Sequence, residues 1–175
     1  YEESFFLDLE KINFAELNQE EKEKFLPLFF IAQILDEASL QKFKFSKVEI
    51  AKTKLLRKWH LFLKNKNIAQ LNELDRFKLH QELEMFLPSF IFYLPQNLRI
   101  TWLNRWRDID DKLFHPSNLL NGDLIKKNFN INDGPILGKL LKFLSMELAY
   151  KRLNNFDEAI NTAKQWIEQN APKCD

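Results

Sequence analysis

The chain has 175 residues, 45% of them hydrophobic, and its 17 Phe and 4 Trp supply enough apolar surface for one domain or two small helical lobes. Only three Gly are present, which disfavours an all-β fold with many tight turns and a glycine-rich phosphate loop. The single Cys174 cannot form an internal disulfide, and no stretch resembles a signal peptide or a membrane span. We therefore expect a cytoplasmic all-α protein, an irregular array of roughly eight to ten helices in two contiguous lobes.

Charge is unevenly distributed along the chain, although the net charge is only +1. Residues 1–41 contain ten acidic and three basic residues, whereas residues 42–66 contain nine basic residues and one acidic residue, Glu49. The remainder holds fourteen of each sign. The basic segment has enough charge to contact phosphates, and a solvated lysine face is the alternative that charge alone leaves open.

Two capping pairs predict the starts of the first long helices. Asn18 with Glu21 forms a capping box, and Pro27 is expected to bend or restart the helix that follows. Ser46 with Glu49 begins a second helix inside the basic segment. The apolar stripe of the first helix is Phe25, Leu28, Phe29, Ala32 and Leu35, and that of the second is Val48, Ala51, Leu55, Trp59 and Phe62.

The lysines of the second helix form a facet beside its apolar stripe. Lys47, Lys54 and Lys58 recur at helical spacing on that facet. Arg57 and Lys64 lie near it in the sequence. These five residues are the first candidates for contacts with phosphates.

Between residues 75 and 113 the sequence predicts a buried segment flanked by two helices. Asp75 can cap the first helix, and the apolar residues 90–94 between two prolines are expected to be buried. The second helix carries Trp102 and Trp106, whose four-residue spacing favours the core over base stacking. Its apolar stripe is Leu98, Trp102, Trp106, Ile109 and Leu113, and its possible phosphate ligands are Arg99, Arg105 and Arg107.

Catalytic and metal-binding patterns are missing from the sequence. His60, His80 and His115 are scattered without a paired Asp, which favours surface or capped histidines over ligands. On the predicted helix, Asp108 and Asp110 point about 200° apart and so cannot hold one ion. We therefore expect no catalytic residue, metal or cofactor in this chain.

All three glycines lie in the C-terminal third. Gly122 and Asp123 begin a short predicted helix, and Gly134 with Pro135 suits the first turn of a longer one. One turn later, Gly138 permits close approach of another backbone or of a ligand. A last helix is expected after the sequence Asn155-Phe156-Asp157-Glu158-Ala159.

This succession of motifs resembles the tail of bacterial class II tRNA nucleotidyltransferases, the CCA-adding enzymes, and of their poly(A) polymerase relatives. The specific part covers residues 116–166, including the Gly-Asp and Gly-Pro pairs and Lys139 after the third glycine. Upstream, the sequence Phe45-Ser46-Lys47-Val48-Glu49 is similar to the family's body region, with less specific residues. The resemblance implies body-like residues 1–113 and tail-like residues 114–175, packed as one unit.

The resemblance also implies a function. Family members add CMP and AMP to tRNA 3′ ends, with CTP, ATP and Mg²⁺ bound in an N-terminal catalytic head. None of the head's motifs is matched here, so we expect this chain to be cut from a longer enzyme and inactive alone. Its expected partners are the acceptor and T-arm side of tRNA, held by phosphate contacts, and its own catalytic head.

A second phosphate-binding place is expected at the start of the Gly134-Pro135 helix, with Lys139 and Lys142 on its first turns. The alternative for this place is that the Gly-Pro turn and Gly138 serve interhelical packing alone. For the chain as a whole, the alternative function is a helical scaffold that binds protein and not RNA. No residue period supports a repeat architecture.

Overall fold

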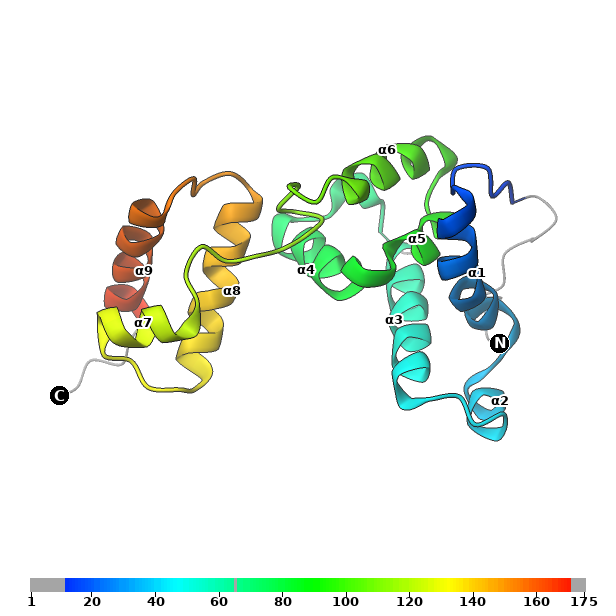
Figure 1. Ribbon diagram of the computed structural model, residues 1–175, viewed down its shortest axis with the longest axis horizontal. Helices are drawn as coiled ribbons and strands as arrows, with labels where there is room; N and C mark the ends of the chain where they lie inside the picture. Colours follow the sequence, from blue (N-terminus) through cyan, green and yellow to red (C-terminus); the bar gives the residue numbers. More distant parts are fainter. Residues whose placement is uncertain (1–11, 65, 171–175) are drawn as a thin grey trace. The chain divides into compact units, whose positions relative to one another are not determined.

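The computed structural model describes residues 12–64 and 66–170, and Figure 1 shows helices joined by short turns and, between α6 and α7, by a longer loop. No strand occurs among these described residues, so the predicted all-α fold is confirmed. The chain divides into two compact units between Ile109 and Asp110, which we call the N-terminal unit and the C-terminal unit. The division expected after residue 113 falls just inside the second of them.

In its described part, the N-terminal unit contains α-helices of four to 18 residues, and short turns of 3-10 helix occur between α3 and α6. The α-helices are α1 (Gln19–Ile34), α2 (Glu37–Lys42), α3 (Lys47–Lys64), α4 (Glu73–Leu83), α5 (Leu87–Phe90) and α6 (Gln96–Arg107), and the 3-10 turns are Ile68–Gln70, Glu84–Phe86 and Ile91–Tyr93. The capping box of α1 is confirmed: the Glu21 N–H donates to Asn18 Oδ1 (2.8 Å) and the Asn18 N–H donates to Glu21 Oε2 (2.9 Å). Helix α1 continues through Pro27 to its end at Ile34.

Helix α3 begins at the predicted cap but buries a different face from the predicted one. The Glu49 N–H donates to Ser46 Oγ at 3.2 Å, and the Ser46 N–H donates to Glu49 Oε2 at 2.9 Å. Val48 is 61% exposed, so the predicted stripe is wrong at its start. The buried residues are Thr53, Leu56, Trp59 and His60. Two of these are polar residues, which is why the apolar pattern indicated the wrong face.

Aromatic rings fill much of the core of the N-terminal unit. Phe29 is fully buried, with ring centroids 5.9 Å from Phe14, 5.2 Å from Phe92 and 5.6 Å from Tyr93. The apolar segment between the two prolines is buried as predicted, because Phe90, Ile91, Phe92 and Leu94 are each at most 3% exposed. Edge-to-face ring pairs of this kind stabilise a core beyond their buried area.

Two other predicted boundaries in this unit need correction. Helix α4 begins at Glu73, because Asn72 and not Asp75 is its N-cap, with Asn72 Oδ1 accepting from the Asp75 N–H at 2.8 Å. Helix α6 ends at Arg107, so Asp110 lies outside any helix and the predicted helical spacing of the aspartates is wrong. Ile109, expected in the apolar stripe, is 69% exposed.

Up to residue 170, where the described part ends, the C-terminal unit contains three helices, α7 (Gly122–Phe129), α8 (Pro135–Ala149) and α9 (Phe156–Asn170). Their predicted starts are confirmed: Asn121 caps α7, Gly134 precedes Pro135 at the start of α8, and Asn155 Oδ1 accepts from the Glu158 N–H at 2.9 Å. The core is aliphatic and consists of Leu120, Ile125, Leu137, Leu140, Leu144, Leu153, Ala159 and Ala163.

Of the three glycines of this unit, Gly134 is the one with a backbone conformation that favours glycine. Gly134, the N-cap of α8, has φ +158° and ψ −175°, a conformation that residues with side chains rarely adopt. A Cβ added at Gly138 would meet no atom within 4 Å. Close helix packing at Gly138 is therefore not observed. A Cβ at Gly122 would make ordinary contacts with Leu137 and Leu141, at 3.6 Å and 3.9 Å.

Candidate nucleic-acid interface

The predicted lysine facet lies on the solvent side of α3. Each helical residue advances about 100° around the axis, so Lys47, Lys54 and Lys58 lie within about 40° of one another. All three are exposed. The centre of the buried face, at Leu56, lies on the opposite side of the helix. Lys47, Lys54 and Lys58 therefore lie further from the core than the sequence indicated.

Acidic residues from neighbouring helices pair with two of these lysines. Lys54 Nζ lies 2.6 Å from Glu37 Oε1, and Lys58 Nζ lies 2.5 Å from Glu82 Oε2. The same Glu82 oxygen accepts from Trp59 Nε1 at 2.8 Å. Both pairs are partly exposed, so they are weak, and a dense row of phosphates can compete with them.

Further lysines extend the basic surface at the start of α3. Lys42 is the last residue of α2 and Lys44 lies in the turn that follows it, and both are exposed, as is Lys47. In the described part of the chain, none of the three forms an ion pair. Together with Lys54 and Lys58 they form what we call the basic face: Lys42, Lys44, Lys47, Lys54 and Lys58.

Arg57 lies beside the basic face but is held by the backbone of α1. Its guanidinium donates to the Ala32 carbonyl at 2.9 Å and 3.2 Å, and also to the Leu35 carbonyl. These are carbonyls at the C-terminal end of α1, where a cation is favoured by the helix dipole. Partial burial lowers the pKa of Arg57. The geometry therefore supports a role in joining α1 to α3 and not the predicted phosphate contact.

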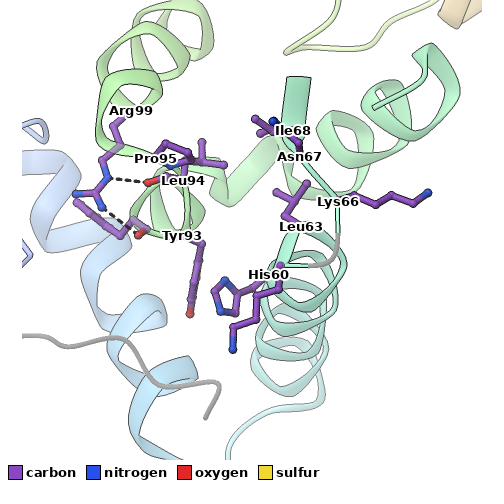
Figure 2. Close-up of a pocket in the computed structure, with 11 residues that line it drawn as sticks. His60, Leu63, Lys66, Asn67, Ile68, Tyr93, Leu94, Pro95 and Arg99 are labelled. Atoms are coloured by element: carbon purple, nitrogen blue, oxygen red, sulfur yellow. Dashed lines mark hydrogen bonds between the residues drawn. The ribbon is translucent and has the colours of Figure 1, made fainter. Parts of the chain in front are cut away.

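A pocket of about 490 Å³ lies near the C-terminal end of α3. Figure 2 shows His60 and Tyr93 facing each other, and Arg99 held by backbone carbonyls. Arg99 donates to Leu94 O at 3.2 Å and to Phe92 O at 3.3 Å. The residues lining the pocket are His60, Leu63, Lys64, Lys66, Asn67, Ile68, Phe92, Tyr93, Leu94, Pro95 and Arg99. Three cations and no carboxylate line it, although Lys66 Nζ lies 3.6 Å from Asp75 Oδ2 and Arg99 Nη1 lies 3.9 Å from Glu16 Oε1.

The titratable pair in this pocket is poorly suited to acid–base catalysis near neutral pH. Burial lowers the pKa of His60 to about 4, with a smaller contribution from the charge of Lys64. Burial also raises the pKa of Tyr93 above its usual range, although its hydroxyl accepts from Gln33 Nε2 at 2.7 Å. Both groups are therefore neutral at pH 7, and the pocket offers binding groups more than a catalytic base.

The structure also places the other residues that the sequence singled out. Arg107 pairs with Glu21 at 2.5 Å, and this hydrogen bond lowers the pKa of the carboxyl. Trp106 donates to the Glu84 carbonyl at 2.7 Å and packs against the core, in keeping with the preference for a core position. Arg105 is exposed. Arg107 and Trp106 are thus held by protein groups.

Two of the three histidines differ from the expected surface position. His60 and His80 are buried, at 6% and 1% exposure, so the surface interpretation is wrong for both. His115 is half-buried. The His80 ring lies 4.8 Å from the ring of Trp102, which shows that imidazoles fill space among aromatic residues in this unit.

The second predicted phosphate site, at the start of α8, has mixed charge. Lys139 and Lys142 are exposed, as are Gly134 and Pro135. The exposed carboxylate of Asp133 immediately precedes Gly134. Lys126 Nζ lies 3.0 Å from Asp123 and 3.1 Å from Asp133, and these bonds raise the pKa of Lys126. A carboxylate at the helix start competes with phosphate there, so the geometry favours the basic face over this site.

Three residues at the end of α2 were not among the site residues predicted from the sequence: Lys42, Phe43 and Lys44. Both lysines were counted in the basic segment 42–66, and the alternation Lys42-Phe43-Lys44-Phe45 was the available signal.

Among the described residues, no cluster of three or more potential metal ligands is found. In that same part of the chain, no helix combines the length and apolar character needed to cross a bilayer. Comparisons with protein-family models, curated proteins and solved structures give no match for this chain.

Proposed function

We propose that this chain binds RNA through the phosphate backbone, with the basic face as its main contact surface. The RNA is proposed to be tRNA, held on its acceptor and T-arm side for 3′-end nucleotide addition by a separate catalytic head, as the resemblance to tRNA nucleotidyltransferases implies. Binding by phosphate contacts suits such a role, because every tRNA must be accepted whatever its sequence.

The observation that carries this proposal is the position of the lysines. The axial rise of about 1.5 Å per residue spreads Lys47, Lys54 and Lys58 over about 16 Å of α3, on the side opposite its buried face. Lys42 and Lys44 extend this surface beyond the helix. A protein with a net charge of only +1 thus places five of its 26 lysines and arginines on one surface, where they can contact phosphates.

A protein-binding scaffold is the second candidate, and exposed apolar residues on α3 favour it. Val48 is 61% exposed and Leu61 is 45% exposed, both beside the basic face. The dependence of binding affinity on salt concentration distinguishes the two functions. Phosphate contacts weaken steeply as salt rises, whereas apolar contacts do not.

The proposal is tested by titrating fluorescent tRNA with the chain at several salt concentrations and comparing it with the double variant Lys54→Gln/Lys58→Gln. Loss of two phosphate contacts should weaken binding roughly tenfold or more and reduce the salt slope by about 1.5 to 2. The matched control, Lys127→Gln/Lys164→Gln in the C-terminal unit, removes the same charge from exposed positions and should bind like the wild type. If both double variants bind tRNA with the same affinity and the same salt slope, the basic face is not the contact surface.

Two further measurements sharpen this test. Arg57→Lys keeps the charge but loses the bonds to α1, so it should lower stability and leave the salt slope unchanged. The chain incubated with tRNA, CTP, ATP and Mg²⁺ should incorporate no nucleotide. Incorporation of CMP or AMP by the chain alone would contradict the assignment of the chemistry to a separate head.

A further inference from the structure

The turn between α2 and α3 presents an aromatic ring within a cluster of lysines. Phe43 is 62% exposed, and Lys42 and Lys44 flank it in the sequence. Single exposed apolar residues are common on protein surfaces and need no special explanation. What distinguishes Phe43 is the backbone that holds it and the charge around it.

The backbone at this turn is fixed by a hydrogen-bonded helix end. The Phe45 N–H donates to Leu40 O at 3.1 Å and the Lys44 N–H donates to Gln41 O at 3.0 Å, the two bonds of a Schellman motif. Lys44 takes the left-handed position, with φ +58°, where glycine is the usual residue because a side chain is strained there. The ring of Phe43 is therefore carried by an ordered turn, which lowers the entropy lost on binding.

Two exposed lysines flank the ring in the sequence, while the carboxylates of this region accept hydrogen bonds at the starts of α2 and α3. Asp36 Oδ1 accepts from the Ser39 N–H at 2.7 Å, and Glu49 accepts from the backbone and hydroxyl of Ser46. Lys42 and Lys44 form no ion pair within the described ranges 12–64 and 66–170. A ligand for this turn must then combine a flat apolar surface with negative charge.

We infer that Phe43 is a stacking site for an unpaired RNA base, and that Lys42 and Lys44 hold the phosphates on either side of that base. This inference rests on the proposed function and narrows its ligand to RNA with single-stranded or loop nucleotides. Every base has a face that can stack on an aromatic ring, but in an A-form duplex those faces are already stacked. A membrane surface fits less well, because α2 has only six residues and buries Leu40, leaving a single exposed ring.

The inference is tested with two RNAs of equal charge, one single-stranded and one fully paired, using the 175-residue chain and fluorescence anisotropy. Phe43→Ala should weaken binding to the single strand about fivefold or more and binding to the duplex less than twofold. Phe43→Trp keeps a stacking ring and should restore binding to the single strand. The matched control is Met85→Ala, which truncates a side chain that is 77% exposed away from the lysine cluster and should bind like the wild type.

The outcomes separate this inference from the proposed function. If the wild type binds neither RNA, both fail. If it binds both RNAs and Phe43→Ala weakens neither, or weakens both equally, stacking is overturned and phosphate binding stands. Vesicles of phosphatidylcholine with phosphatidylserine are the third arm: binding to them that depends on Phe43, without selectivity between the RNAs, would assign the turn to a membrane surface instead.

Discussion

The two units bury their helices with different kinds of side chain. The N-terminal unit packs phenylalanine and tyrosine rings together and also buries polar residues, among them Gln33, Thr53 and Ser89. The core cluster of the C-terminal unit is leucine, isoleucine and alanine, Phe114 is buried as well, and Ser145 is the unit's buried polar residue among those described. The N-terminal unit therefore adds directional contacts to its apolar burial, whereas the C-terminal unit depends mainly on apolar burial.

The buried polar residues of the N-terminal unit each connect separate parts of the backbone or fix a face. Ser89 Oγ donates to Phe25 O at 2.8 Å, joining residues 64 positions apart. Thr53 Oγ1 donates to Glu49 O at 2.9 Å within α3, so its hydroxyl is satisfied in the core. Among the side-chain bonds that join α3 to its neighbours are those of Arg57 to Ala32 O and of Trp59 Nε1 to Glu82 Oε2, and such contacts require one geometry. Polar contacts in the N-terminal unit therefore help to orient the helix that carries the basic face.

The largest expected loss of stability follows from truncating a core side chain in either unit. Phe29→Ala should cost about 4 kcal/mol, and Leu140→Ala about 3 kcal/mol, because both side chains are fully buried. Hydrogen exchange measured by mass spectrometry should rise in α1–α6 for the first variant and in α7–α9 for the second. If Leu140→Ala opens the helices of both units equally, the two cores do not act separately.

An intermediate effect is expected from acid, because the N-terminal unit buries His60. Its pKa is about 4 when folded and about 6.5 when unfolded, so the unfolded chain binds more protons between these values. The stability contributed by neutral His60 is complete above pH 6.5 and falls by about 1–2 kcal/mol as the pH drops to 5. Urea unfolding at several pH values measures this loss.

His60→Phe should flatten this dependence between pH 6.5 and 5, because the phenyl ring fills similar space without a proton to bind. Titration of the His60 ring protons by NMR supplies an independent check. A midpoint near 6.5 in the folded chain would show that burial does not hold this imidazole neutral, and an unchanged slope in the variant would lead to the same conclusion.

The smallest expected change in stability concerns two lysines with the same backbone conformation, one in each unit. Lys44 and Lys151 both have positive φ at the end of a Schellman motif, the latter confirmed by the Arg152 N–H donating to Glu147 O at 2.8 Å. Glycine at either position should raise stability by about 0.5–1 kcal/mol, as seen in thermal unfolding. RNA affinity should fall for Lys44→Gly alone. Equal affinities would remove Lys44 from the basic face.

Local signals in the sequence predicted the helix starts well. The capping box at Asn18, the pair at Ser46 and the Gly134-Pro135 start each depend on residues within one turn, and the structure contains all three. The C-terminal unit follows its sequence more closely because aliphatic periodicity and caps decide its three helices. Asn72, which caps α4 three residues before the predicted cap, shows that two neighbouring polar residues can compete for one role.

Contacts between distant residues could not be predicted from the sequence. The buried face of α3 includes Thr53 and His60, whose burial depends on partners that a helical period does not reveal. The pairing of Lys54 with Glu37 and the capture of Arg57 by Ala32 O depend on how α1, α2 and α3 pack. The sequence therefore shows where basic residues are concentrated, but only the structure shows which of them bind protein groups and which face solvent.

The carboxylates paired with the basic face have a consequence for which anions it can select. Glu37 and Glu82 occupy Lys54 and Lys58, so an anion that binds these two lysines must displace a resident carboxylate. A lone phosphate or a nucleotide offers little more than the carboxylate it replaces. Under the proposed function, a polymer that presents many phosphates together would be attracted by the whole face and would release bound cations as it docks. The paired glutamates would then make these two lysines respond to the density of negative charge, which would favour RNA over small anions.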